Sequence, residues 1–417
     1  MTVTMSTLSN GLRIVTDSMA SVETIALGVW VGAGTRHEIE ELNGISHLLE
    51  HMAFKGTERR TAREIAEQMD SVGGQLNAYT SRDHTAYYAK VLKEDVALAL
   101  DILSDILLHS TMDPAELVRE QHVVVQEILQ TADTPDDIIF DHFQSVAFPD
   151  QPMGWPVLGS EKIVRSISSD ALKTYLANSY SGTNMVISAS GNVDHKDFFT
   201  KVETVFSNVP GHSHQAPIPS RYVGGEYREA RALEQVHLVL GFEGVPFSDP
   251  DYYNTAALSV LFGEGMSSRL FQQIREKRGL VYSIFSNTTS FDDSGIFSIY
   301  AGSGAGEVKE LIPVLADEIS KVAETLETHE IERARIQLKA GLLMALESPS
   351  SRCIQRARQI LVHGHPLSTE EIIKKVDSVD IAGVKDAAER IFQSSPAFAC
   401  IGPIDAVEKL QEFTSRL

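Results

Sequence analysis

The beginning of the chain is rich in apolar, β-branched stretches bounded by polar turn residues, a pattern that predicts β-strands. Residues 11–15 and 24–31 are two such stretches. Residues 75–91 form a longer one, which we interpret as a hairpin that turns near residues 81–83. The start of the chain is therefore expected to form part of a sheet.

Segments between and after these strands predict helices. Thr61, followed by Glu64, forms the signature of a capping box, and the glycines at 73–74 end that segment. Asp113 and Pro114 supply an N-cap and a first-turn proline for a later segment. The expected helices begin near Ile45 and cover residues 61–72, 93–109 and 113–132.

The same order of strand, helix, helix, hairpin and helices recurs later in the chain. A segment rich in proline, glycine and serine separates the two halves, and we take residues 209–224 as the linker. The recurring elements are expected at residues 236–241, 253–262, 268–278 and 280–301. The sequence therefore predicts an α+β fold of two homologous α/β-sandwich halves, 1–208 and 225–417, related by internal duplication. Each half is expected to be a mostly antiparallel sheet covered by helices.

Composition and charge exclude several classes of protein. A chain of 417 residues is long enough for two or three domains. It carries 57 Asp and Glu against 36 Lys and Arg, a net charge of −21, and no basic stripe, so we expect no nucleic-acid partner. No run of about 18 apolar residues occurs, so no membrane span is expected.

The cysteines and the first residues bear on the compartment. Cys353 and Cys400 cannot form a disulfide framework, which indicates a reducing compartment or indifference to redox conditions. Residues 1–17 have neither the pattern of a secretory signal nor that of an Arg-rich transit peptide. We expect a bacterial cytoplasmic protein, with the mitochondrial matrix as the alternative.

The expected helix near Ile45 carries the most informative motif, His47-Leu48-Leu49-Glu50-His51. His47 and His51 lie four residues apart and share one helix face, so their imidazoles can bind one metal ion. Glu50 lies beside them. The opposite face is an apolar stripe of Ile45, Leu48, Leu49 and Met52. The alternative is a helix with two histidines that only face solvent.

A catalytic zinc needs a third protein ligand, and the segment 113–132 offers one. Glu120 and Glu127 are seven residues apart and therefore lie on one helix face. We interpret Glu127 as a ligand and Glu120 as a support for a ligand or for water. The alternative is an acidic edge exposed to solvent.

These motifs together resemble those of the inverted-zincin peptidases, the family of pitrilysin, insulin-degrading enzyme and mitochondrial processing peptidase. The likeness is greatest to the catalytic β subunit of processing peptidase and its bacterial relatives, and it extends over essentially the whole chain. It is carried by HLLEH, by Glu127 76 positions after His51, and by the flanking residues 44–46, 52–57 and 76–82. The resemblance implies one zinc ion per chain, bound by His47, His51 and Glu127. It also implies that Glu50 is the general base and that Glu120 is a supporting carboxylate.

The resemblance assigns two further residues to the second half. Arg275 and Tyr282 match an Arg and a Tyr that hold substrate and stabilise the oxyanion in the family, and Gly279 should break the helix between them. Without the resemblance they are an ordinary surface arginine and strand tyrosine. Residues 253–262 contain no histidine, so no second metal site is expected, and the short loop 263–268 favours a catalytic subunit.

Substrate contacts are also implied by the family pattern. Asn77 and Ala78 match the strand that binds an extended peptide, and Phe54 matches a pocket for a bulky residue after the cut. Asp137 and Asp141 match an acidic pair that grips arginine, although the family has Glu at the first position. The alternatives are a plain strand and a core phenylalanine.

The motifs and this resemblance together imply a zinc endopeptidase that hydrolyses extended, basic peptides or presequences; a closed chamber formed by two chains is the precedent of the family. The partner is expected to be an identical chain or a related one. The alternative is a non-catalytic scaffold of the same fold, like the core proteins of the respiratory bc1 complex. A metal-storage protein is a third reading, and Glu50 argues against it because storage does not need a carboxylate that is not a ligand.

Overall fold

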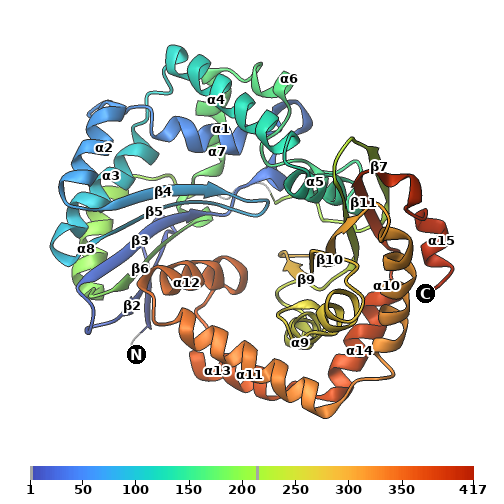
Figure 1. The fold of residues 1–417 in the computed structure, drawn as a ribbon. Coiled ribbons are helices and arrows are strands. Elements are labelled where there is room, and N and C mark those ends of the chain that lie inside the picture. The colour runs from blue at the N-terminus through green and yellow to red at the C-terminus, as the bar shows by residue number, and fades with distance from the viewer. Residues whose placement is uncertain (1–2, 213–215) are drawn as a thin grey trace. The chain divides into compact units, whose positions relative to one another are not determined.

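The computed structural model describes residues 3–212 and 216–417, which fold into two α+β units, each around its own sheet (Figure 1). Residues 213–215 of the expected linker lie outside the described residues. The first unit contains residues 1–129, 155–218 and 343–367, and the second contains 130–154, 219–342 and 368–417. Each unit therefore combines segments that are far apart in the sequence.

The first unit contains a six-stranded sheet in the order β1-β2-β6-β3-β5-β4. All neighbouring strands are antiparallel except β2 and β6. The strands are β1 (Val3–Thr7), β2 (Arg13–Ser18), β3 (Thr24–Val31), β4 (Gln75–Thr80), β5 (Thr85–Leu92) and β6 (Met185–Gly191). The helices of this part are α1 (Ile45–Ala53), α2 (Ala62–Ser71), α3 (Val96–Leu108), α4 (Pro114–Ala132), α6 (Glu161–Val164), α7 (Ser169–Ser179), α8 (His195–Phe206) and α12 (Pro349–His363).

Both faces of this sheet are covered, which explains why β3 is apolar at almost every position. Leu27 and Val29 pack into a core shared with α1 and α3, whereas Trp30 points to the other face. There it meets Cys353 and Ala357 of α12. The helix that closes this face thus comes from a part of the chain more than 300 residues away.

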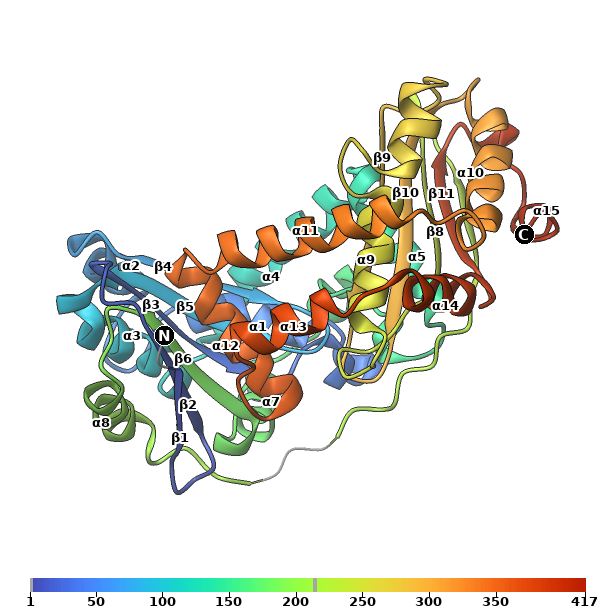
Figure 2. The same cartoon turned by 90° about the horizontal axis from the view of Figure 1, so that it is seen from below.

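The second unit contains a five-stranded sheet in the order β7-β11-β8-β10-β9. The strands are β7 (Gly225–Ala230), β8 (Gln235–Glu243), β9 (Ser283–Ser290), β10 (Gly295–Gly304) and β11 (Ala397–Gly402). The remaining helices are α5 (Pro135–Ala147), α9 (Tyr252–Gly263), α10 (Val308–Val322), α11 (Thr328–Ala345), α13 (Thr369–Asp377), α14 (Ile381–Phe392) and α15 (Leu410–Thr414). Helices α9, α10 and α14 share one core with the sheet, and α5 packs on its other face (Figure 2).

The two sheets repeat one topology. Taken in chain order, the last five strands of the first sheet and the five strands of the second have the same arrangement, including one parallel pair at the corresponding position. This agreement is what internal duplication predicts, and the expected α+β fold with mostly antiparallel sheets is confirmed. Among the described residues, no helix is long and apolar enough to cross a membrane.

Candidate metal centre

Helix α1 is held at its N-terminus by a buried carboxylate rather than by its own N-cap. The N-cap residue, Gly44, has φ 95° and no side chain to cap the helix. Glu38, which is 5% exposed, accepts hydrogen bonds from the backbone N–H groups of Gly44 (2.8 Å) and Ser46 (2.9 Å). Asn43 Nδ2 donates a third bond at 2.9 Å. The first turn is therefore fixed by a group outside the helix, although burial raises the pKa of Glu38.

The two faces of α1 differ as the sequence predicts. The apolar stripe is at most 1% exposed and lies in the core. His47, Glu50 and His51 lie on the other side and are partly exposed. The imidazole rings of His47 and His51 meet edge to face, with centroids 4.6 Å apart. The core therefore orients the face that carries the polar groups.

Glu127 of α4 completes a cluster with the two histidines. Its Oε2 lies 3.6 Å from His47 Nε2 and 3.5 Å from His51 Nε2. The three ligand atoms lie within 4.8 Å of one another, and they form the one such group of three or more His, Cys, Asp or Glu found in the described part of the chain. In a tetrahedral zinc site with bonds of about 2.0–2.1 Å, neighbouring ligand atoms lie about 3.3 Å apart. The separations and the donor types fit a zinc site.

The environment of His47 also suits a metal ligand. Burial, together with a smaller contribution from the nearby His51, lowers the pKa of His47 to about 3. The imidazole is therefore neutral at neutral pH, as a ligand must be. Its Nε2 faces the cluster, whereas its Nδ1 is buried and has no hydrogen-bond partner among the described residues.

Glu120 contacts the other side of His51. It lies two turns before Glu127 on α4 and is 4% exposed. His51 Nδ1 lies 3.2 Å from Glu120 Oε2, and Lys55 Nζ lies 2.8 Å from Oε1. The carboxylate can thus accept the Nδ1 proton of His51 and leave Nε2 directed at Glu127. Sequence reasoning missed Lys55, although it follows His51 by four residues.

Glu50 has a different partner. Thr80 Oγ1, at the end of β4, donates a 2.6 Å hydrogen bond to Glu50 Oε2. Burial raises the pKa of Glu50, and the Thr80 bond and His51 oppose that rise. A carboxylate with a raised pKa beside a metal-type cluster is suited to accept and release a proton. Sequence reasoning also missed Thr80, since nothing local links β4 to α1.

Comparison with known proteins places this chain in a family. The model described as Insulinase (Peptidase family M16) matches residues 13–161, and the one described as Peptidase M16 inactive domain matches residues 166–338. An uncharacterized zinc protease of Rickettsia felis is 39% identical over 401 residues, which cover 96% of this chain and 97% of that protein. The chain belongs to the M16 peptidase family. The resemblance inferred from the sequence is thereby confirmed.

Two further comparisons characterise this M16 peptidase. The probable mitochondrial-processing peptidase subunit beta of Arabidopsis thaliana is 34% identical over 426 residues, covering 98% of this chain and 80% of that protein. The crystal structure of a protease from Helicobacter pylori matches with a TM-score of 0.89 and 22% identity, over 96% of this chain and 99% of that one. The second match concerns the fold alone.

The strand β4 of this M16 peptidase forms an edge of its sheet. Asn77 is exposed, and its Oδ1 accepts a 2.8 Å hydrogen bond from the backbone N–H of Ala78. That N–H group is thus covered by a side chain and not by another strand. Phe54 is the C-cap residue of α1 and is partly buried against the core. The centroids of its ring and of the Tyr87 ring lie 6.3 Å apart.

The remaining predicted site residues belong to the second unit of the M16 peptidase. Arg275 lies on η6 (Phe271–Glu276), a π-helix, with its guanidinium carbon 4.8 Å from the Phe271 ring centroid and 5.8 Å from that of Tyr282. Tyr282 is 75% exposed. Gly279 adopts φ 64° after this helix, as expected for a break. The structure thus brings Arg275 and Tyr282 together.

The acidic pair lies on α5 in the same unit. Asp137 is exposed in its first turn, and Asp141 is partly buried one turn later on the same side.

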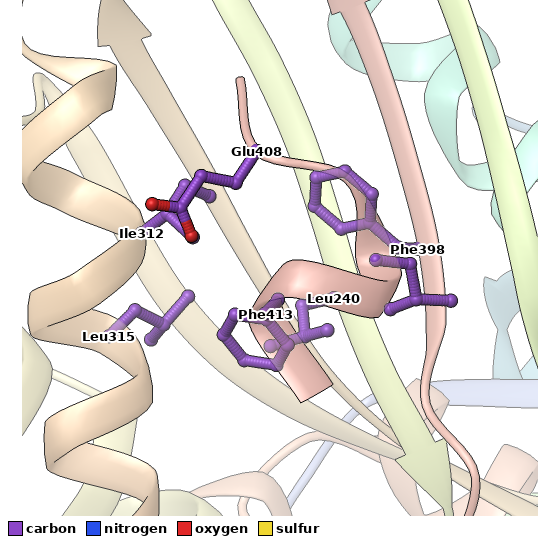
Figure 3. Close-up of a pocket in the computed structure, with 7 residues that line it drawn as sticks. Leu240, Ile312, Leu315, Phe398, Glu408 and Phe413 are labelled. Carbon is purple, nitrogen blue, oxygen red and sulfur yellow. The ribbon is translucent and has the colours of Figure 1, made fainter. Parts of the chain in front are cut away.

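The second unit also encloses a cavity of about 10 Å³, room for no more than about one water molecule. Its walls are Leu240, Ile312, Leu315, Phe398, Glu408, Leu410 and Phe413 (Figure 3). It is too small to hold a substrate.

Proposed function

We propose that this chain is a zinc-dependent endopeptidase of the HxxEH type, with one zinc ion held by His47, His51 and Glu127. The observation that carries the proposal is the convergence of these three donors: Glu127 Oε2 lies 3.5–3.6 Å from the Nε2 atoms of both histidines, and all three ligand atoms lie within 4.8 Å of one another. Family membership and relatives named zinc proteases support the same activity. A bound zinc would lower the pKa of water towards neutrality and polarise the scissile carbonyl group.

Side chains of the protein are proposed to carry out proton transfer, to orient a ligand and to bind the substrate. Glu50 takes the proton of the attacking water and later delivers a proton to the leaving amine. The Thr80 bond is made to Oε2, so we assign the proton transfer to Oε1. Glu120 accepts the Nδ1 proton of His51 and so directs Nε2 to the metal. Arg275 and Tyr282 are proposed to hold substrate and to stabilise the oxyanion.

The substrate is proposed to be an extended, basic peptide. An exposed edge such as β4 binds a peptide main chain with little demand on its sequence, and Asn77 and Ala78 lie at that edge. The net charge of −21 favours basic peptides, and Asp137 and Asp141 would contact an arginine before the cut. Phe54 would border the pocket after the cut. By the precedent of subunit beta, two chains, identical or related, would enclose the peptide.

The test compares wild type with Glu50→Gln on an arginine-containing fluorogenic peptide, with zinc content measured in parallel. We expect about one zinc per chain in both proteins and a loss of turnover of at least about a hundredfold in the variant. The matched control is Glu67→Gln, because Glu67 is exposed and pairs only at the surface of α2 with Arg63. Wild-type turnover by Glu50→Gln contradicts the mechanism, and a zinc-loaded wild type that cleaves no peptide favours the scaffold alternative.

A further inference from the structure

We propose that Thr80 is a positioning residue, which holds Glu50 through its side chain while its main chain binds the substrate. The inference rests on the proposed peptidase function and deepens it. It links peptide docking on β4 to the orientation of the base. The residue itself would not touch the reacting atoms.

The side chain of Thr80 faces α1. Residues of a strand alternate between the two faces of the sheet, so Thr80 shares its face with Leu76 and Ala78, which pack against the core that contains α1. The 2.6 Å distance from Thr80 Oγ1 to Glu50 Oε2 is in the range of a hydrogen bond to an ionised carboxylate. No other described side chain donates a hydrogen bond to Glu50 in the structure. Thr80 therefore fixes the rotation of this carboxylate.

The backbone N–H and C=O groups of Thr80 lie in the plane of the sheet and point towards its open edge. The backbone N–H of Ser81 donates to the carbonyl oxygen of His84 at 2.9 Å, so these two residues form a hydrogen-bonded pair in the hairpin. Hydrogen-bonded and non-hydrogen-bonded pairs alternate along antiparallel strands. The next pair, Thr80 with Thr85, is therefore of the second kind. Its backbone groups on β4 point away from β5.

The same alternation accounts for a contact two residues earlier. Ala78 also belongs to a non-hydrogen-bonded pair, and its outward N–H is the one that Asn77 Oδ1 covers at 2.8 Å. A peptide that adds to this edge would bond to the main chain of Ala78 and Thr80. Docking would then restrain the residue that holds Glu50, so peptide binding and base orientation share one anchor.

The substitution Thr80→Val removes the hydroxyl group and keeps the β-branched shape and the strand. We expect kcat to fall about ten- to a hundredfold, since a hydrogen bond to a charged group is lost. KM should stay within about twofold, and zinc content should not change, because the edge and the ligands are intact. Thr80→Ser should recover most of kcat. Thr174→Val, an exposed threonine on α7, is the matched control.

A second measurement uses the metal-free chain and needs no activity. The unfolding equilibria of wild type, Thr80→Val, Glu50→Leu and the double variant form a double-mutant cycle. We expect the effect of Thr80→Val on the unfolding constant to be about tenfold smaller when Glu50 is absent. This readout separates the inference from the proposed function: inactive wild-type enzyme contradicts the function, whereas the cycle still decides whether Thr80 holds Glu50.

Any one of four results overturns the inference. Three of them are independent effects of the two substitutions in the cycle, wild-type kcat in Thr80→Val, and a loss confined to KM. A Thr80→Ser variant no better than Thr80→Val also contradicts it, because serine keeps the donor.

Discussion

Replacing Glu120 with glutamine measures how far a carboxylate beyond the proposed ligands supports zinc binding. Glu120 is 4% exposed and lies 3.2 Å from His51 Nδ1 and 2.8 Å from Lys55 Nζ. Glutamine keeps the size of the side chain and one acceptor oxygen, but it removes the negative charge. We expect zinc to bind more weakly, because His51 then donates to a neutral group and becomes a poorer ligand.

The size of the effect follows from the two contacts. The side chain of Lys55 is 32% exposed, so its ammonium group is hydrated when the ion pair with Glu120 is removed. The loss of that ion pair therefore contributes little to the change in zinc affinity. A hydrogen bond to an ionised group contributes roughly 1.5–3 kcal/mol, against roughly 1 kcal/mol for neutral groups. The difference of about 0.5–2 kcal/mol for His51 corresponds to an increase of about 2- to 30-fold in the zinc dissociation constant.

The assay is a competition titration of zinc between the protein and a chromophoric chelator at fixed pH. Glu116→Gln is the matched control, since Glu116 lies one turn earlier on α4 and pairs with Arg119 at the surface. We expect its dissociation constant to equal that of wild type within about twofold. Equal zinc affinity in Glu120→Gln and wild type would refute the role assigned to Glu120.

Two further predictions concern stability. Asp17 is fully buried and forms ion pairs with Arg352 (3.1 Å) and Arg356 (2.9 Å) of α12. The substitution Asp17→Asn should therefore lower the free energy of unfolding by about 3–5 kcal/mol. A loss in urea unfolding as small as that of the surface variant Glu67→Gln would contradict this prediction. Burial lowers the pKa of His84 to about 4, so the unfolded state alone binds this proton between pH 6.5 and 4. Stability should fall by up to about 3 kcal/mol as the pH drops through that window, and by less in His84→Gln, and parallel pH curves for the two proteins would exclude His84 as a cause.

Elements with strong local signals were predictable from the sequence. Strand β3 spans Thr24–Val31 as expected, and the capping box of Thr61 and Glu64 opens α2. The sequence did not show that α5, from the first half of the chain, packs on the second sheet, or that α12, from the second half, packs on the first sheet. Each is an amphipathic helix whose partner sheet is formed by residues far away in sequence, and helical periodicity does not say which sheet a helix covers. The buried ion pairs of Asp17 with Arg352 and Arg356 were unpredictable for the same reason, because both arginines lie on α12.

The candidate site divides in the same way. The spacing of His47 and His51 places both on one face of one helix, so their proximity follows from helix geometry alone. The contact with Glu127 joins two helices, so the spacing of Glu120 and Glu127 could only suggest a ligand and left an acidic edge exposed to solvent as the alternative. Thr80 and Glu38 hold their partners across separate elements, and no periodicity in the sequence points to such pairs.

The three carboxylates around the histidines have the same chemistry, and their surroundings are what separate the proposed roles. Glu120 is buried, lies 2.8 Å from the ammonium group of Lys55 and contacts His51 Nδ1 at 3.2 Å. Glu127 has a side chain that is 39% exposed, and its Oε2 faces two imidazoles, as the proposed metal ligand should. Glu50 has no described cationic side chain as a hydrogen-bond partner, only the hydroxyl group of Thr80, and its pKa is raised by burial. Of the three carboxylates, Glu50 is therefore the one whose surroundings best fit the proposed role of base.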